Sequence, residues 1–290
     1  MSYDFAVVGG DRRFFYLAQF LKNKKFKVIG FNFFNFENEI CEFEVATSLQ
    51  EALMSAKNWV LPIPVSRDGI FLNVEKKVSA KLKISEILSL ARKEVGVFGG
   101  AFSNCLHANF KKRVKFIYDY LESESFAVFN AGLTAQAAIA QAVLKSSFNF
   151  NSSCCLVLGF GRCGKLLALE LKKLCFKVVV CARNEIQLAW ARALGFEAFN
   201  LACLGSGKPT NLKQFNLIFN TIPKKILSGS ILDSLNEEVF IFDITPNGID
   251  SKELEKKSIN FFVSLQIPGK FKPKPSAEYL SNLVVEFLNI

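Results

Sequence analysis

The amino-acid sequence predicts an α/β protein with two doubly wound parallel-sheet domains joined by a long interdomain helix. Apolar strand segments alternate with helical segments along the chain, which is typical of parallel sheets. The length of 290 residues suits two domains of ordinary size, each with its own core. In the second half, a glycine-rich turn at residues 159–164 lies directly between a predicted strand and a predicted helix.

The first domain is predicted over residues 1–130. Its strands are short apolar runs followed by glycine, proline or asparagine, residues that end strands and open turns. A helix follows the first strand and runs through Leu21. The expected strands are residues 5–8, 26–31, 58–61, 95–98 and 126–129.

An interdomain helix and linker are predicted over residues 131–150. The helix is expected from Thr134 to about Leu144, because this segment is rich in Ala and Gln. The second domain is predicted over residues 151–265, and a C-terminal loop and helix over residues 266–290. Two domains joined in this way are expected to leave a cleft, the usual place for a site. The strands of the second domain are expected at residues 154–158, 177–181, 216–220, 238–243 and 260–263.

The composition predicts a soluble protein with reduced thiols. No apolar run reaches the roughly 18 residues of a membrane span, and the start lacks a signal-peptide pattern, so we expect a cytoplasmic protein without membrane contact. The eight cysteines form no C-x-x-C pair and His107 is the single histidine, which argues against a metal site. The formal charge of +10 comes without a nucleic-acid recognition motif, so we expect small anionic ligands and no nucleic-acid partner.

The turn at residues 159–164 matches the G-x-G-x-x-G spacing of Rossmann dinucleotide-binding domains. Gly159 would make the tight turn, Gly161 would let the backbone approach a pyrophosphate, and Gly164 would let the helix pack on the strand. The helix N-terminus supplies N–H groups and partial positive charge to the phosphates. The alternative is a purely structural glycine-rich turn. The other predicted binding residues of the turn are Phe160, Arg162 and Cys163.

The end of the next strand selects between NAD and NADP. An Asp or Glu there would bind the ribose 2′-hydroxyl of NAD, but the chain has Ala182, Arg183 and Asn184. A guanidinium group suits the 2′-phosphate, so the sequence favours NADP. Glu185 keeps NAD open if the register shifts by one residue, and the alternative for Arg183 is a solvated surface arginine.

A related turn opens the first domain, where Gly9 and Gly10 follow the first strand and the third glycine is missing. A Rossmann-like domain on the substrate side is therefore favoured over a second nucleotide site. Asp11 and Arg13 follow at the carboxyl end of the strand, where open α/β sheets bind ligands. The alternative is an Asp that caps the helix, next to exposed arginines.

Several motifs together resemble the family of the dipicolinate synthase A-subunit, nearly from end to end. They are an N-terminal Gly-Gly-Asp, an Asn-Thr-Ile-Pro sequence after a late strand, and Pro-Gly and Pro-Lys pairs near the end. The resemblance implies oxidation of dihydrodipicolinate to dipicolinate with NAD(P)⁺ during sporulation, in the mother-cell cytoplasm, together with a flavoprotein-like B-subunit. These motifs stand at residues 9–11, 220–223, 268–269 and 273–274.

The chain departs from the family pattern at two places. The family has an acidic residue near the start of the linker helix, where this chain has Gln136. The family's Arg-Pro-Gly-Gly after a late strand is reduced to Thr-Pro-Asn-Gly at residues 245–248. Lineage drift or an altered substrate would both account for these departures.

The chemistry implied needs a nicotinamide held against the substrate and an anion clamp, while aromatisation makes acid–base demands mild. The candidate catalytic residues are Thr134, Asp243 and His107, for which an N-cap (Thr134) and a structural ring (His107) are alternatives. Asn220, Thr221 and Pro223 are expected to border the nicotinamide ribose. Because a dicarboxylate favours Arg or Lys, the predicted substrate-binding residues are Asp11, Arg13, Arg67, Ser103, Asn104 and Lys274.

Other functions fit parts of the sequence. D-2-hydroxyacid dehydrogenases share a two-domain plan but need a late His, and no His follows His107, so that class is excluded. A non-catalytic nucleotide-binding partner subunit stays open because no general base is obvious. An oxidoreductase for another cyclic imino dicarboxylate also stays open, as does a homo-oligomer.

Overall fold

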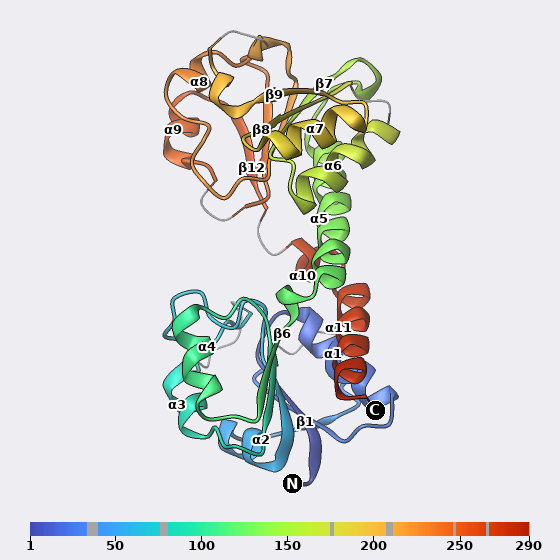
Figure 1. Ribbon diagram of the computed structural model, residues 1–290, viewed down its shortest axis with the longest axis vertical. Coiled ribbons are helices and arrows are strands. Elements are labelled where there is room, and N and C mark those ends of the chain that lie inside the picture. Colours follow the sequence, from blue (N-terminus) through green and yellow to red (C-terminus); the bar gives the residue numbers. More distant parts are fainter. Residues whose placement is uncertain are drawn as a thin grey trace. The chain divides into compact units, whose positions relative to one another are not determined.

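The structure is a computed structural model that describes residues 1–33, 40–75, 81–174, 177–206, 211–245, 248–264 and 267–289. It divides into two compact units, each built around one six-stranded sheet (Figure 1). The first unit comprises Met1–Ala127 and Gly269–Ile290, and the second comprises Val128–Pro268. The first unit therefore combines two separate segments of the chain.

The sheet of the first unit has the strand order β3-β2-β1-β4-β5-β6, and all its strand pairs are parallel. Its central strands are rich in Val, Ala and aromatic residues and are buried on both faces, as parallel sheets require. The strands are β1 (Tyr3–Val8), β2 (Val28–Phe31), β3 (Glu44–Val45), β4 (Ala56–Val60), β5 (Gly96–Gly99) and β6 (Phe116–Asp119).

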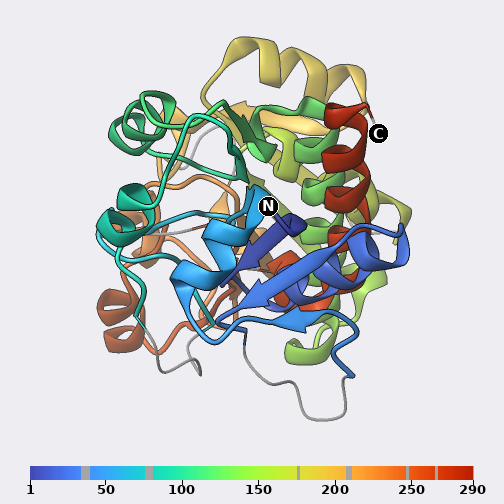
Figure 2. The ribbon, with the colours of Figure 1, turned by 90° about the horizontal axis from the view of Figure 1, so that it is seen from below.

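Helices cover both faces of the first sheet. On one face, α1 and α11 share a core with Phe5 and Val7 of β1. On the other face, α2, α3 and α4 share a core with Trp59 of β4. Figure 2 shows α11 (red) beside α1 (blue) on one side of this sheet. The helices are α1 (Arg12–Asn23), α2 (Leu49–Ser55), α3 (Ile84–Ser89), α4 (Asn104–Lys111) and α11 (Pro273–Leu288).

The second unit repeats this plan. Its parallel sheet has the order β12-β11-β10-β7-β8-β9. One face packs against α5, α6 and α7, and the other against α8 and α9. The strands are β7 (Cys154–Leu158), β8 (Lys177–Ala182), β9 (Glu197–Asn200), β10 (Leu217–Asn220), β11 (Phe240–Asp243) and β12 (Asn260–Val263). The helices are α5 (Glu124–Lys145), α6 (Arg162–Lys173), α7 (Glu185–Ala193), α8 (Ser230–Asp233) and α9 (Ser251–Lys256). The first residues of α5 belong to the first unit, and the short α10 (Ile267–Phe271) has residues in both units.

The predicted fold class is confirmed, but one predicted strand is wrong. Residues 126–129 form part of helix α5, which begins at Glu124, and the last strand of the first sheet is β6. The hydroxyl of Ser123 accepts a hydrogen bond from the Phe126 amide at 3.4 Å, and an acidic residue follows in the first turn, so a helix start is stabilised here. The edge strands β3, β6 and β9 were not predicted from the sequence.

Helix α5 also meets the length and hydropathy of a membrane-spanning helix, because it has 22 residues and contains an 18-residue stretch with a mean hydropathy of 1.4. Core helices of soluble proteins pass the same test, and Ala135, Ala138 and Ala142 of α5 are buried in the core of the second unit. The helix therefore gives only weak support for membrane insertion.

Candidate functional site

The glycine turn follows β7 and leads directly into α6. Gly159 has a φ of +93°, a conformation that residues with a side chain rarely adopt. A Cβ there would lie 2.5 Å from Thr221 Oγ1, and the Thr221 hydroxyl donates to the carbonyl of Leu158 at 2.8 Å. Thr221 therefore packs against the turn and fixes it from the neighbouring strand β10.

The other two positions of the turn are occupied by glycine for different reasons. A Cβ on Gly164 would lie 2.1 Å from the carbonyl oxygen of Gly159, so only glycine lets α6 approach the end of β7. Gly161 is the N-cap of α6 and provides no side-chain cap, and a Cβ there would meet no atom within 4 Å. The space at the N-terminus of α6 is therefore open, and helix amides favour an anion in such a place.

A cavity of about 410 Å³ lies at this turn within the second unit. It is bounded by the glycine turn, the end of β8 and the loop after β10. The predicted cofactor-binding residues that line it are Gly159, Phe160, Gly161, Arg183, Asn184, Thr221 and Pro223. Ile222, which also lines it, lies within the predicted Asn-Thr-Ile-Pro motif. Sequence reasoning missed the other lining residues, Gln187, Leu201, Lys224 and Ile226, of which Lys224 adjoins that motif.

The remaining predicted cofactor-binding residues do not line the cavity. Ala182 is fully buried in the core, and Gly164 is buried where α6 packs on β7. Burial raises the pKa of the Cys163 thiol, which is consistent with a packed rather than a reactive cysteine. Arg162 is exposed in the first turn of α6. The fifth residue, Asn220, is buried at the end of β10.

After the end of β8, Arg183 and the nearby acidic residue Glu185 have different surroundings. Arg183 is exposed and lines the cavity. The Asn184 side chain caps α7 by accepting from the Ile186 amide at 2.8 Å. Glu185 accepts from the Asn200 side chain at 2.9 Å and is not among the residues that line the cavity. Glu185, the residue that could have favoured NAD, is thus held against β9, while Arg183 faces the cavity.

Asn220 and Asp243 form a buried polar cluster at the ends of β10 and β11, and each is 1% exposed. Asp243 Oδ1 accepts from Asn220 Nδ2 at 3.0 Å, from the Thr245 hydroxyl at 2.7 Å and from the Thr245 amide at 3.0 Å. Asn220 also bonds both backbone groups of Ile222, at 3.1 Å each. The cluster therefore ties the loop that lines the cavity to the next strand.

The same cluster explains why a glycine ends the Thr-Pro-Asn-Gly segment at residues 245–248, where the chain departs from the family pattern. A Cβ on Gly248 would lie 2.3 Å from Asn220 Nδ2 and 2.6 Å from Asp243 Oδ2. Burial raises the pKa of Asp243, while hydrogen bonds from Thr245, Asn220 and Gly248 act in the opposite direction. Pro246 and Asn247 lie outside the described residues.

Thr134 does not stand at a helix start, contrary to the sequence-based expectation. Because α5 begins at Glu124, Thr134 lies well inside the helix, and it is 7% exposed. Its hydroxyl donates to the carbonyl of Asn130 at 2.8 Å. Neither the N-cap nor a carboxylate held by a helix N-terminus applies to this residue. Gln136, two residues on, is exposed.

The predicted residues around α4 lie in the first unit. Ser103 is the N-cap of α4 and accepts from the Leu106 amide at 3.3 Å, and Asn104 is the first residue of the helix. The ring of His107 packs edge-on against Phe102, with centroids 6.4 Å apart. Ser103 also lines a separate cavity of about 360 Å³ with Leu106, whereas His107 and Asn104 do not.

The Gly-Gly turn of the first unit is closed by the protein itself. The Gly9 amide donates to the carbonyl of Phe31 at 3.0 Å and the Gly10 amide to that of Asn73 at 3.1 Å. The Asp11 side chain caps α1 by accepting from the Arg13 amide at 3.1 Å. Unlike the open N-terminus of α6, this helix start is already capped by a carboxylate, which disfavours a phosphate there.

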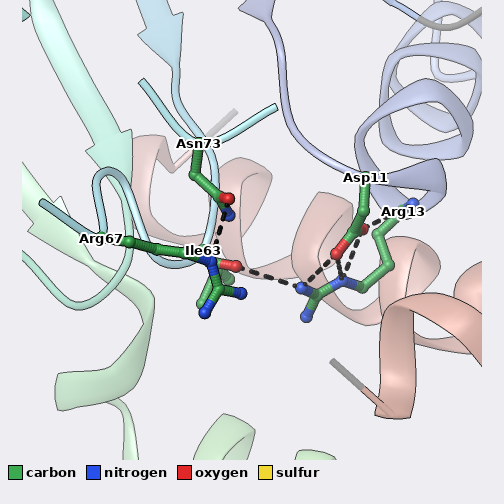
Figure 3. A network of polar contacts seen from close by, with 5 residues as sticks. All are labelled: Asp11, Arg13, Ile63, Arg67 and Asn73. Atoms are coloured by element: carbon green, nitrogen blue, oxygen red, sulfur yellow. Dashed lines mark hydrogen bonds and ion pairs between the residues drawn. The ribbon is translucent and has the colours of Figure 1, made fainter. Parts of the chain in front are cut away.

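Asp11 and Arg13 form a buried ion pair, with 7% and 4% of each residue exposed. Arg13 Nε and Nη2 donate to the two Asp11 oxygens at 2.9 and 2.7 Å, and Nη2 also donates to the carbonyl of Ile63 at 3.2 Å (Figure 3). Neither the capping Asp nor the arginine is exposed, so the alternative of exposed arginines does not describe Arg13.

Two further predicted substrate-binding residues are exposed in the first unit. Arg67 donates through Nε to the Asn73 side chain at 3.2 Å. Lys274, near the start of α11, lies over the Tyr16 ring with Nζ 4.9 Å from its centroid. Among the described residues, no group of three or more His, Cys, Asp or Glu side chains is arranged to hold a metal ion.

Comparison with known proteins adds the family. Residues 4–121 match the family described as the N-terminal domain of the dipicolinate synthase A-subunit. The N-terminal domain belongs to this family. The predicted resemblance is thus confirmed. Over 287 residues the chain is 24% identical to the dipicolinate synthase A-subunit of Bacillus subtilis (strain 168), covering 98% of this chain and 95% of that protein.

Solved structures show the same fold. The crystal structure of the dipicolinate synthase A-subunit from Bacillus halodurans has a TM-score of 0.81 and 22% identity, and covers 99% of this chain and 98% of that one. An L-alanine dehydrogenase has a TM-score of 0.60 and 11% identity, with 98% and 90% covered. Two Rossmann-type parallel-sheet units are therefore shared by this chain, its dipicolinate synthase relative and a dehydrogenase.

Proposed function

We propose that the chain is a dehydrogenase-like subunit that oxidises dihydrodipicolinate to dipicolinate with NADP⁺. The observation that carries this proposal is the cavity at the open N-terminus of α6, where the glycine turn and Arg183 come together. The family resemblance supplies the substrate and adds a flavoprotein-like B-subunit, which would act as the partner. It also supports a cytoplasmic protein of a spore former.

The residues present fit a nicotinamide dinucleotide. The open space beside Gly161 suits a pyrophosphate, and the α6 amides supply donors. Arg183 supplies positive charge for a 2′-phosphate, while Thr221 and Pro223 also line the cavity. The bound cofactor would supply the hydride acceptor.

The proposed reaction removes a hydride from one ring carbon of dihydrodipicolinate and a proton from the neighbouring ring position. Two electrons pass to NADP⁺, giving NADPH, and the ring becomes an aromatic pyridine. Because aromatisation drives the step, a strong base is not required. This agrees with the internal hydrogen bonds that already engage Thr134 and Asp243.

The direct test uses the purified full chain together with its partner subunit. Supplied with dihydrodipicolinate and NADP⁺, the wild type should form dipicolinate and NADPH in equal amounts, both followed by ultraviolet absorbance. A complex that binds NADP⁺ but never forms dipicolinate above the rate without protein contradicts the proposal.

Arg183→Ala should weaken binding of NADP⁺ more than binding of NAD⁺. A charge-assisted hydrogen bond to a phosphate contributes about 1.5–3 kcal/mol, so we expect roughly a 10- to 150-fold loss for NADP⁺. Calorimetric titration of both cofactors checks this. Glu185→Gln is the control, because that residue is bonded to Asn200 away from the cavity lining, and it should change neither affinity. Equal losses for both cofactors in Arg183→Ala would rule out the 2′-phosphate role.

A non-catalytic nucleotide-binding subunit is the second candidate. Two of the three candidate catalytic side chains are buried and hydrogen-bonded within the protein, which favours a holding role over a chemical one. Tight NADP⁺ binding, without turnover in any mixture with the partner subunit, would establish this function instead.

A further inference from the structure

We propose that Arg67 binds a carboxylate of the substrate, and that Arg13 is a positioning residue that holds the Arg67 loop in place. The Arg67 loop is defined as residues 61–75, between the end of β4 and the described end of this segment. The assignment of the ligand rests on the proposed dicarboxylate substrate. The positioning role rests on contacts within the first unit alone.

The guanidinium group of Arg13 is already engaged in an ion pair within the protein. Its Nε and Nη2 face both oxygens of Asp11 in a bidentate pair, and both residues are more than nine-tenths buried. This is the geometry with which an arginine would otherwise grip a ligand carboxylate. A substrate would have to displace Asp11 and leave that charge unpaired in a buried place, which is strongly unfavourable.

The ion pair holds two other segments of the first unit. Arg13 Nη2 donates to the carbonyl of Ile63, which lies in the Arg67 loop, at 3.2 Å. A Cβ on Gly269 would lie 2.3 Å from Asp11 Oδ2, so the backbone that precedes α11 packs directly against the carboxylate. The late Pro-Gly motif therefore meets the N-terminal Gly-Gly-Asp motif at this pair.

Asn73 fastens the same loop from its other end. Its carbonyl accepts from the Gly10 amide at 3.1 Å, and its amide donates to the carbonyl of Val65 at 2.9 Å. Its side-chain oxygen accepts from Arg67 Nε at 3.2 Å (Figure 3). The loop is thus attached to the first turn of α1 through Arg13 and to the turn after β1 through Gly10.

Arg67 is the arginine left available by this arrangement. Its side chain is exposed, its Nε is fixed by Asn73, and its two terminal nitrogens make no hydrogen bond or ion pair with the described residues. It follows β4, at the carboxyl edge of the sheet where α/β proteins bind ligands. A planar guanidinium group that is oriented at one nitrogen and open at the other two suits a planar carboxylate.

The experiment compares dipicolinate and NADPH binding in full-chain variants, together with hydrogen–deuterium exchange. Arg67→Gln should weaken dipicolinate binding by roughly 10- to 150-fold, as expected for loss of a charge-assisted pair, while NADPH affinity stays unchanged. Arg67→Lys should recover part of the loss, because it restores the charge but not the fork. Arg113→Gln is the matched control, since Arg113 is exposed and its guanidinium group donates to the carbonyl of Asn109 in α4.

Asp11→Asn combined with Arg13→Met tests the positioning role without leaving a buried charge unpaired. Asparagine still caps α1 and methionine fills the space, so the protein should fold. We expect faster exchange in residues 61–75, unchanged exchange in residues 159–164, and weaker dipicolinate binding at unchanged NADPH affinity.

The outcomes test the role of Arg67 and the role of Arg13 separately. Wild-type dipicolinate affinity in Arg67→Gln overturns the role of Arg67. Unchanged exchange in the Arg67 loop of the double variant overturns the role of Arg13. A wild-type protein that binds NADPH but not dipicolinate refutes the proposed substrate and with it the ligand of Arg67, whereas the exchange measurement still decides the positioning role.

Discussion

Gly161→Asp is expected to abolish NADP⁺ binding while leaving the fold intact. A Cβ at this position meets no atom within 4 Å, and its φ of −77° is open to any residue. Aspartate is also a favourable N-cap, so the melting temperature without ligand should stay the same or rise. With a pyrophosphate at the α6 N-terminus, however, the new carboxylate would place like charges together. Such repulsion costs several kcal/mol, more than 100-fold in Kd.

The control for this variant is Gly164→Ala, three residues further on. Its Cβ would lie 2.1 Å from the backbone oxygen of Gly159, which cannot move aside as a side chain could. This variant should lose stability whether or not a cofactor is present. Melting curves with and without NADP⁺ distinguish the two: a Gly161→Asp protein that is still stabilised by NADP⁺ contradicts the nucleotide site.

Asp243→Ala is expected to destabilise the second unit rather than remove only turnover. The change leaves the buried Thr245 amide without its acceptor. It also removes one of the two acceptors of Asn220 Nδ2 and of the Thr245 hydroxyl, which both donate to the Ile222 carbonyl as well, at 3.1 and 3.3 Å. A buried unsatisfied donor costs about 1–3 kcal/mol, so the loss should be about 1–3 kcal/mol, or roughly 2–12 °C in melting temperature. Because Asn220 holds Ile222 at the cavity, NADP⁺ affinity should fall as well.

The difference in stability between the wild type and Asp243→Ala should change with pH in one direction. Burial raises the pKa of Asp243 above its ordinary value, so the folded protein binds that proton more tightly than the unfolded chain does. Acidification through the raised pKa therefore stabilises the wild type, and Asp243→Ala lacks this gain. The difference between the two melting temperatures should widen as the pH falls. An Asp243→Ala protein with wild-type stability and no turnover would instead identify a catalytic carboxylate.

The glycine turn could be predicted from sequence because its requirements are local. Strand, turn and helix follow one another within a short segment. Gly159 and Gly164 are each required by a neighbour close in the sequence or just after the adjacent strand, and Gly161 leaves the N-terminus of α6 open. The start of α5 was missed because the apolar residues 126–129 fit a buried strand as well as a helix. The cap provided by Ser123 was the signal that could have decided between them.

The role of Arg13 could not be predicted from sequence, because its partners come from distant segments. A motif with Asp11 and Arg13 two residues apart is compatible with a helix cap, an exposed pair or a ligand clamp. The structure selects a buried pair since Ile63 and Gly269 close over it. Neither residue is near Arg13 in sequence, and no periodic pattern links them. The placement of the Arg67 side chain likewise depends on its hydrogen bond to Asn73, which forms only in the folded chain.

The two-segment construction of the first unit has a consequence for biosynthesis. Helix α11 completes the core over α1, yet the ribosome makes it only after the whole of the second unit. The nascent second unit can therefore finish folding while the earlier-made half still shows an uncovered apolar face, which reverses the usual order of N-terminal first. Until α11 docks, that face is a target for chaperones.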